Sequence, residues 1–115
     1  MNRLFIYSSI FDRKLKELRN WSKVQEDIEA AILGDPEIGE LIQGTHGLRK
    51  FRVSYGSKGK SGGLRVLYFD LFSMKKTYMI TFFSKNEKEN LSKEERNMIS
   101  KQILKIKEGI ESKEI

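Results

Sequence analysis

The stretch Leu48–Tyr55 alternates between hydrophobic and charged residues. Phe51 and Val53 fall on one side of an extended chain. Lys50 and Arg52 fall on the other side. Because successive side chains of a β-strand point to opposite faces of its sheet, this pattern predicts a half-buried strand whose second face is cationic.

Three further apolar runs predict other strands. Arg3–Ile10 is short and predicts a first strand. Leu64–Phe72 and Lys76–Phe83 are strongly apolar and are separated only by residues 73–75. Two such runs joined by a short connection predict an antiparallel hairpin at the centre of the sheet.

Apolar residues recur at helical spacing in the segment before the only proline, at Val24, Ile28, Ala31 and Ile32. They predict a helix that begins at Trp21-Ser22. Ser22 and Gln25 have the spacing of a capping box, in which each side chain bonds to a free backbone N–H of the first turn. Residues 34–36, Gly-Asp-Pro, predict the end of this helix, since glycine suits a left-handed cap and proline cannot continue a helix. Residues 11–19 predict one or two helical turns.

A second capping box, Ser92 and Glu95, predicts the start of a last helix. Its apolar stripe consists of Met98, Ile99, Ile103, Ile106 and Ile110. Residues 36–47 are predicted to form a loop. The order of strand, helices, strands and helix predicts an α+β domain: a small antiparallel sheet flanked by an N-terminal helical pair and a C-terminal helix. If the helices cover one face, the other face stays free and carries Lys50 and Arg52.

Length and charge narrow the class of protein. With 115 residues, the chain is predicted to form one domain, 1–115. Hydrophobic residues make up 38% and charged residues 33%, which permits a core beneath a highly charged surface. The formal net charge is +6, and so basic a small domain favours anionic partners, above all nucleic acid. A net positive charge can also simply increase solubility, so the positions of the charged residues say more about nucleic-acid binding than the size of the net charge.

The absence of cysteine excludes disulfides, thiolate zinc sites and a cysteine nucleophile. Small secreted domains usually depend on such cross-links, so a cytoplasmic location is expected. Residues 1–10 lack a signal-peptide core, and no apolar run reaches the length of a membrane span. His46, the only histidine, lies in the predicted loop, where a surface residue is more common than a catalytic one. No second ligand type accompanies it, so neither a metal site nor a cofactor is predicted.

Six cations converge on two adjacent predicted strands and the loop between them: Arg49, Lys50, Arg52, Lys58, Lys60 and Arg65. Guanidinium groups bind phosphate oxygens in pairs, lysine adds a point charge, and loop glycines let backbone N–H groups approach an anion. The cluster predicts a phosphate-binding surface, the alternative being a solvated basic face. Residues 59–61, Gly-Lys-Ser, match the end of a nucleotide-binding P-loop. Nucleotide binding is nevertheless not predicted, because Ser54 replaces the first glycine of that motif and a strand follows in place of a helix.

The end of the predicted hairpin, 81–87, offers a second set of candidates. One of the two neighbouring rings, Phe82 or Phe83, is expected in the core and the other at the surface, where it could stack on an unpaired base. Lys85 and Glu87 form a neighbouring acid–base pair. The alternative is an ordinary strand end with solvated charges.

Several ordered segments resemble the HigB branch of the RelE-type toxins. They are 42–45 (Ile-Gln-Gly-Thr), 47–53 (Gly-Leu-Arg-Lys-Phe-Arg-Val), 58–68 (Lys-Gly-Lys-Ser-Gly-Gly-Leu-Arg-Val-Leu-Tyr) and 83–87 (Phe-Ser-Lys-Asn-Glu). The resemblance covers nearly the whole chain. It implies a RelE-type fold, cleavage of mRNA in the ribosomal A site and neutralisation by a cognate antitoxin, expected to be a helix-turn-helix protein. The chain departs from the family at Asn86, where RelE carries an arginine, and at Phe83, where HigB-like members often carry a hydroxylated ring.

The resemblance also implies a reaction and its residues. The ribose 2′-OH would attack its own 3′ phosphate, leaving a 2′,3′-cyclic phosphate and a 5′-OH. Arg65 would stabilise the charge that grows on the phosphate, and a lysine or Glu87 would move the protons. The implied catalytic set is Arg65, Lys50, Arg52, Lys85 and Glu87. The implied contacts to RNA or the ribosome are Arg49, Lys58, Lys60 and Phe83.

Two other functions stay open from the sequence. One is a non-catalytic toxin or nucleic-acid-binding module of the same fold, similar to the gyrase-poisoning ParE branch. The other is a basic adaptor that binds only protein. The retained cations favour RNA cleavage. Arg65 shares strand parity with Leu67 and Phe69, so a twist or bulge after residues 62–63 is expected to turn it to the open face.

Overall fold

The computed structural model describes residues 2–56, 63–88 and 90–114, the side chains of 110–114 excepted. Lys58 and Lys60, both predicted to bind RNA, lie outside the described residues, as do segment 59–61 and the side chain of Ile110. The elements in chain order are β1 (Leu4–Tyr7), α1 (Ser9–Lys16), α2 (Trp21–Gly34), β2 (Glu40–Leu41), β3 (Leu48–Val53), β4 (Leu64–Leu71), the 3-10 helix η2 (Phe72–Met74), β5 (Lys76–Ser84) and α3 (Lys93–Glu114). None of the described helices is both long enough and apolar enough to cross a membrane.

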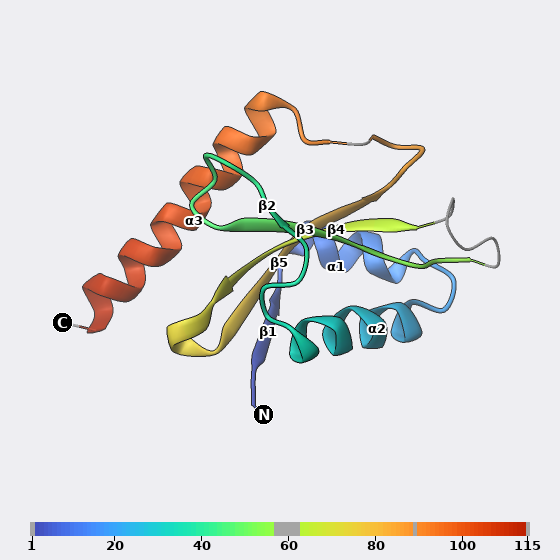
Figure 1. Cartoon of the computed structure of the whole chain (residues 1–115), viewed down its shortest axis with the longest axis horizontal. Coiled ribbons are helices and arrows are strands. Elements are labelled where there is room, and N and C mark those ends of the chain that lie inside the picture. Colours follow the sequence, from blue (N-terminus) through green and yellow to red (C-terminus); the bar gives the residue numbers. More distant parts are fainter. Residues whose placement is uncertain (1, 57–62, 89, 115) are drawn as a thin grey trace.

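Within the described residues, five strands form one sheet in the order β1-β5-β4-β3-β2 (Figure 1). All neighbouring strands are antiparallel except β1 and β5, which run parallel with Leu4 opposite Lys76. The α+β class is confirmed, but the prediction of an antiparallel sheet is wrong at this edge. The hydrophobic pattern of a four-residue strand does not encode the direction of its neighbour. β2 lies inside the predicted loop 36–47, because two residues are too few to leave an alternating pattern.

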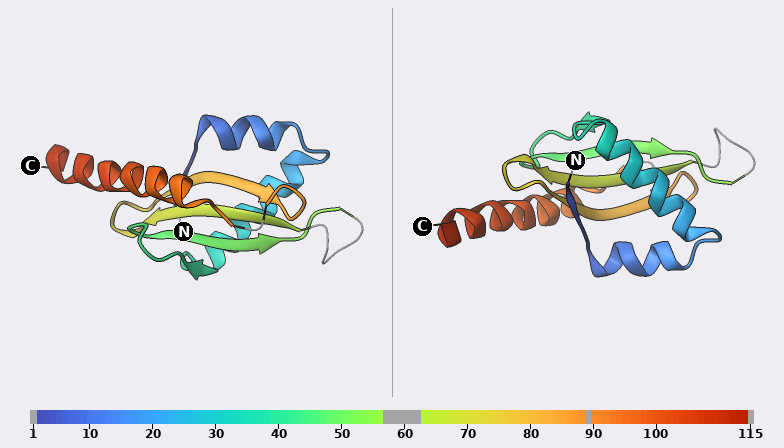
Figure 2. Two further views of the ribbon diagram at one scale, coloured as in Figure 1. Left: turned by 90° about the horizontal axis from the view of Figure 1, so that it is seen from above. Right: turned by 90° about the horizontal axis from the view of Figure 1, so that it is seen from below.

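Helices lie on both faces of the sheet (Figure 1). α1 and α2 pack on one face through a core cluster that includes Phe11 and Ile28. α3 packs on the other face through Ile99 and Ile103 and continues past the sheet (Figure 2). The expectation that one face stays free of helices is therefore wrong. Because β4 supplies buried side chains to both clusters, its sequence is apolar without strict alternation.

The first turns of α2 and α3 begin differently. The capping box predicted for α3 is confirmed, since the Glu95 N–H donates to Ser92 Oγ (3.1 Å) and the Ser92 N–H donates to Glu95 Oε1 (2.8 Å). The box predicted at Ser22 and Gln25 is wrong. α2 begins one residue before Ser22, after Asn20, whose φ of 59° is left-handed. Ser22 thus lies inside the first turn, where its hydroxyl cannot act as the N-cap.

The free edge of β5 is covered by α1. β1 ends early, so the carbonyls of β5 from Ile80 onward have no neighbouring strand on that side. Ser8 caps α1 by accepting from the Phe11 N–H (3.0 Å) and donates to the Ile80 carbonyl (2.6 Å). Lys14 donates to the Phe82 carbonyl. These side chains form hydrogen bonds with edge carbonyls that could otherwise pair with a strand of another molecule. They also fix the end of β5 beside the candidate site.

Candidate nucleic-acid interface

Three of the predicted catalytic cations lie on one face of the sheet. The register pairs Arg52 with Arg65, and Lys50 with Leu67. Phe83 of β5 pairs with Arg65 from the other side. Residues that pair directly in antiparallel strands share a face, and Leu67 and Phe83 belong to the cluster under α3. We refer to Lys50, Arg52 and Arg65 as the cationic face.

Arg65 lies on this face through the regular alternation of side chains along β4. It shares the α3 side with Leu67 and Phe69, and the described register shift between β4 and β5 comes after Leu67. The expectation of a twist or bulge after residues 62–63 is therefore wrong. α3 covers Leu67 and Phe69 and then runs away from the end of the sheet where β4 begins (Figure 1). One face is thus apolar under the helix and cationic beyond it.

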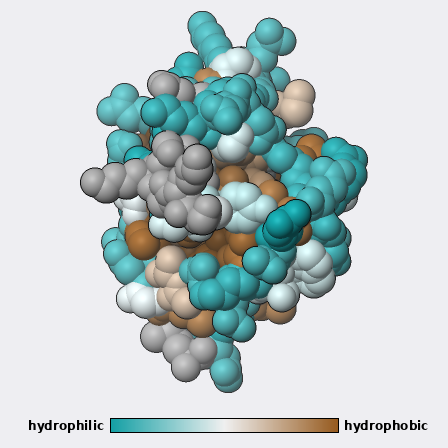
Figure 3. Space-filling model, turned by 90° about the vertical axis from the view of Figure 1, so that its right-hand side faces the viewer, coloured by the Kyte–Doolittle hydropathy of each residue, from teal (hydrophilic) through white to brown (hydrophobic). Residues whose placement is uncertain are grey.

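The two guanidinium groups of the cationic face have different surroundings. Arg65 is half-buried, and its Nη1 is a buried donor without a hydrogen-bond partner in the described structure. An unmade hydrogen bond of this kind costs free energy that a phosphate oxygen would restore. Arg52 lies beside Gly63, where an added Cβ would come within 3.5 Å of its Nε and Nη2. The glycine therefore leaves room for the guanidinium. Hydrophilic residues surround a smaller hydrophobic patch at this end of the molecule (Figure 3).

Lys50 links the cationic face to a pocket. Its Nζ donates to Asn90 Oδ1 (2.9 Å) in the segment between β5 and α3. Both residues line a pocket of about 310 Å³, here named the β2–α3 pocket. Its other lining residues are Glu40, Leu41, Ile42, Leu67, Leu91 and Arg96. The sequence analysis missed Glu40, Asn90 and Arg96, because they come from separate segments and form no motif; only the capping box that fixes the start of α3 pointed toward this region.

Arg49 and His46 lie apart from the cationic face. The Arg49 guanidinium donates to the carbonyls of Glu37 (2.9 Å) and Gly39 (3.2 Å). As the neighbour of Lys50 in β3, Arg49 points to the opposite side of the sheet, so the structure does not bring it to the predicted phosphate site. His46 is exposed and precedes β3, whereas Arg52 lies near the far end of that strand.

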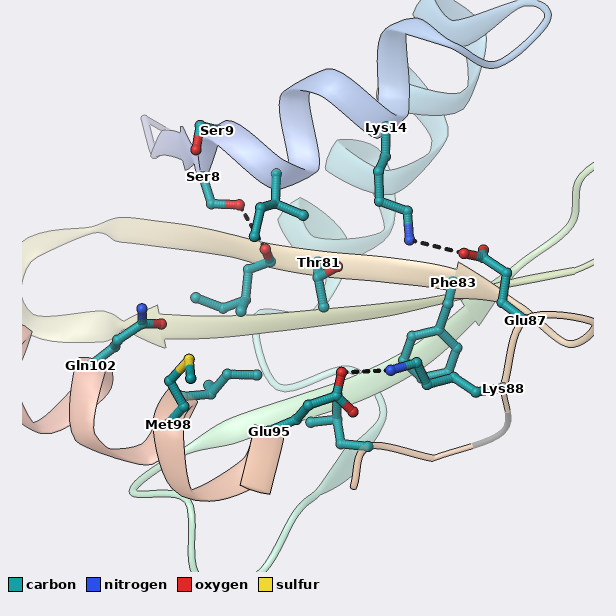
Figure 4. A pocket seen from close by; sticks show the side chains of 14 residues that line it. Ser8, Ser9, Lys14, Thr81, Phe83, Glu87, Lys88, Glu95, Met98 and Gln102 are labelled. Atoms are coloured by element: carbon teal, nitrogen blue, oxygen red, sulfur yellow. Dashed lines mark hydrogen bonds and ion pairs between the residues drawn. The ribbon is translucent and has the colours of Figure 1, made fainter. Parts of the chain in front are cut away.

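Glu87 faces α1 and is not paired with Lys85. Its carboxylate accepts from the Ser84 N–H (2.9 Å) and faces Lys14 Nζ at 3.4 Å (Figure 4). The backbone hydrogen bond from Ser84, followed by the charge of Lys14, lowers the pKa of Glu87, so the group is ionised at neutral pH. Lys85 and Asn86 are exposed, and no hydrogen bond or ion pair between Lys85 and Glu87 occurs among the described residues. The predicted acid–base pair is therefore not assembled.

Phe83 does not offer an open stacking surface. Phe82 and Phe83 are each 2% exposed, so the expectation that one ring lies at the surface is wrong. Phe82 joins the α1–α2 cluster and Phe83 the α3 cluster, because adjacent strand residues here meet helices on both faces. Lys88 Nζ lies 5.7 Å from the Phe83 ring centroid and bonds to Glu95 (2.5 Å; Figure 4). A ring with so little of its surface exposed is not open to an unpaired base.

No protein-family model matches this chain. Its fold is similar to the isolated E. coli RelE toxin, with a TM-score of 0.57 at 15% identity over 91% of this chain and 99% of that one. A mutant of E. coli RelE in the free state gives 0.57 at 13% identity over 76% and 87% of the two chains. The intact E. coli RelBE toxin–antitoxin complex gives 0.54 at 14% identity over 72% and 96%. The chain therefore has the RelE toxin fold.

Proposed function

We propose that this protein is the toxin of a type II toxin–antitoxin system and that it cleaves mRNA on the ribosome. The observation that carries the proposal is the convergence of Lys50, Arg52 and Arg65 on one face of a RelE-type fold. Cations fixed on a rigid sheet can hold a phosphodiester without reorganising during the reaction. The cognate antitoxin, the ribosome and mRNA are the proposed partners, and the proposed location is the cytoplasm.

The proposed reaction is an internal phosphoryl transfer in RNA. The ribose 2′ oxygen forms a bond to the adjacent phosphorus while the bond from phosphorus to the 5′ oxygen of the next nucleotide breaks. The 2′-OH proton is lost and the 5′ oxygen gains a proton, which gives a 2′,3′-cyclic phosphate and a 5′-OH. Arg65, whose buried Nη1 has no partner in the part of the chain that the structure describes, and Arg52 hold the phosphate oxygens as their negative charge grows.

Proton transfer fits Lys50 better than the other candidates. Lys50 belongs to the cationic face, and its Nζ is held in place by Asn90. Lys85 is exposed at the end of β5, opposite the start of β4, and is the second candidate. Glu87 is an ionised carboxylate directed at Lys14, so its use would require that contact to open. The ribosome would hold the RNA in line for attack, which lowers the demand on the toxin's own groups.

Cell-free translation with the purified protein tests the proposal. Primer extension on the translated mRNA is expected to show cuts inside codons, and the upstream products are expected to end in a 2′,3′-cyclic phosphate. Co-expression with the product of an adjacent small gene is expected to abolish the cuts. Intact mRNA together with gyrase–DNA cleavage complexes would favour the gyrase-poisoning alternative, and intact mRNA and DNA would favour the protein-binding adaptor.

A further inference from the structure

The turn that follows β5 is closed by hydrogen bonds between its two ends. The N–H groups of Glu87 (3.0 Å) and Lys88 (3.3 Å) donate to the Ser84 carbonyl. The side chains add a reciprocal pair, since the Ser84 N–H donates to Glu87 Oε1 (2.9 Å) and the Glu87 N–H donates to Ser84 Oγ (3.3 Å). This pair has the arrangement of a capping box, although no helix begins at Ser84. The turn is therefore held at its ends, and the two residues between them, Lys85 and Asn86, are exposed.

Lys14 of α1 holds the same turn from outside. Its Nζ faces the Glu87 carboxylate at 3.4 Å (Figure 4) and also donates to the Phe82 carbonyl. The ammonium lies 5.1 Å from the centroid of the Phe82 ring, which is buried in the core. An ion pair as exposed as that of Lys14 and Glu87 contributes little to stability by itself. Its main consequence is geometric, because it links the turn to a helix and a strand that are fixed by packing.

The turn begins beside the cationic face. Phe83, near the end of β5, pairs with Arg65, which pairs with Arg52 on the next strand. The turn starts at the following residue, Ser84. Lys85 comes two residues after Phe83, which is at most about 7 Å along an extended chain. How the turn is held therefore determines where the Lys85 ammonium lies relative to the two guanidinium groups.

We propose that Glu87 is a positioning residue for Lys85, an inference that rests on the proposed function. Together with Lys14, it fixes the turn so that the Lys85 ammonium meets the RNA phosphate held by the cationic face. A lysine side chain has several rotatable bonds, so a backbone that is fixed before the RNA binds lowers the entropy lost in that contact. Lys85 then adds a positive charge to the phosphate without reorganisation of the turn during the reaction.

The direction of the Glu87 carboxylate fits positioning better than proton transfer. A carboxylate that faced the RNA would repel the phosphate. Both oxygens of Glu87 are instead engaged on the protein, Oε1 by the Ser84 N–H and Oε2 by the Lys14 ammonium. Hydrogen bonds and a positive charge that stabilise the ionised form make a carboxylate a poor proton acceptor. The same contacts make it an effective brace for the turn.

Single-turnover cleavage of mRNA on stalled ribosomes, with the protein in excess at several concentrations, tests this role. Glu87→Ala should lower the maximal rate about tenfold and leave the half-saturating protein concentration within about twofold of wild type. A mere loss of folded protein would raise the half-saturating concentration and leave the maximal rate unchanged. Glu87→Gln keeps an acceptor for the Ser84 N–H and should lower the rate less. Asp12→Asn removes a similarly exposed carboxylate that pairs with Lys16 on α1, and this matched control should change neither quantity.

A Lys85→Ala background shows whether Glu87 acts through Lys85. Lys85→Ala alone should lower the maximal rate by at least as much as Glu87→Ala. In that background, Glu87→Ala should cost less than about twofold, because no ammonium is left to position. Lys14→Met should lower the rate of the otherwise wild-type protein as Glu87→Gln does. The double variant Lys14→Met/Glu87→Gln should be no slower than the slower single variant, since both remove the same ion pair.

The outcomes separate this inference from the proposed function. If Glu87→Ala costs as much without Lys85 as with it, Glu87 acts on its own, and the positioning role is overturned. Full activity of either Glu87→Ala or Lys85→Ala also overturns it, and in each of these cases the nuclease stands. No cutting by the wild-type protein overturns the proposed function and the inference with it. If Glu87→Ala fails to fold, as judged by circular dichroism, Lys14→Met decides, because it leaves the hydrogen bonds within the turn in place.

Discussion

The two faces of the sheet are built from the same strands but are completed in different ways. On the α1–α2 side, Val66 and Tyr68 of β4 are fully buried, and the Tyr68 hydroxyl donates to the carbonyls of Pro36 (3.0 Å) and Ile38 (2.8 Å). On the α3 side, Leu67 is equally buried, but Arg65 has a buried donor with no hydrogen-bond partner among residues 2–56, 63–88 and 90–114. One face is closed by apolar packing and satisfied hydrogen bonds, and the other is closed only as far as α3 extends.

Under the proposed function, this difference separates the residues that stabilise the fold from those that bind RNA within single strands. Alternate residues of β4, Leu64, Val66 and Tyr68, belong to the α1–α2 core, so the packing of that face does not depend on the side chains of the other face. The α3 side combines a hydrophobic half, which holds the helix, with a cationic half that bears an energetic cost of its own. Local costs of this kind are commonly kept at functional sites, where a ligand removes them.

The largest expected effect comes from Arg65→Ala. Removing a preorganised donor for a charged transition state lowers cleavage by about 100- to 1,000-fold. The melting temperature should change little, because the variant also removes a buried donor that no described residue satisfies. Arg13→Ala, at an exposed arginine of α1, is the matched loss of charge and should cut normally. Quantitative primer extension and a thermal melt measure both quantities. A folded Arg65→Ala protein that cuts within about threefold of wild type would remove Arg65 from the mechanism.

A smaller effect compares the packing of the two faces. Ile28 of α2 and Ile103 of α3 are both 0% exposed, one in each core cluster. Ile28→Val and Ile103→Val should each lower the free energy of unfolding by about 1 kcal/mol, since each deletes one buried methylene. Urea denaturation followed by circular dichroism measures the change. If Ile103→Val left the free energy of unfolding unchanged while Ile28→Val lowered it, the packing of α3 on the sheet would contribute little to stability.

Local periodicity predicted much of this arrangement. The alternation around Phe51 placed Lys50 and Arg52 together on one face, and the spacing of Ser92 and Glu95 located the start of α3. Such patterns depend on residues within two to four positions of each other, which is the range over which strand and helix geometry act. They also sufficed for the α+β class. The resemblance to RelE-type toxins named a fold that the structure confirms.

Long-range placement was beyond reach of the same patterns. The parallel pairing of β1 with β5 and the side on which α3 docks depend on the whole topology. Phe83 was misjudged for this reason: with helices on both sides, both neighbouring rings find a core. The β2–α3 pocket was missed because Glu40 and Arg96 are far apart in sequence and meet only after the sheet and α3 have packed. No local pattern in a single sequence indicates that two such distant residues line one pocket.

The smallest expected effect concerns the start of α3, which marks the border between the covered and the open half of its face. The hydrogen bond from Lys88, followed by that from the Ser92 N–H, lowers the pKa of Glu95 in the folded protein. A lowered pKa means that the carboxylate stabilises the fold above the pKa of the unfolded chain, and that this contribution is lost as the pH falls through the folded pKa. The pair with Lys88 is solvent-exposed, so Glu95→Gln should cost at most about 0.5 kcal/mol at neutral pH. Glutamine keeps an acceptor for the Ser92 N–H, so the lost part is the charge.

Urea denaturation of wild type and Glu95→Gln at several pH values between about 7 and 3 measures that charge contribution. The difference in unfolding free energy should shrink toward zero once the carboxyl is protonated in both states. The same difference should be smaller in a Lys88→Gln background, because the largest cause of the lowered pKa is then absent. A difference that stays constant down to the lowest pH would show that the capping hydrogen bonds alone hold the start of α3. The position at which α3 begins would then depend on these capping hydrogen bonds and not on the ion pair between Lys88 and Glu95.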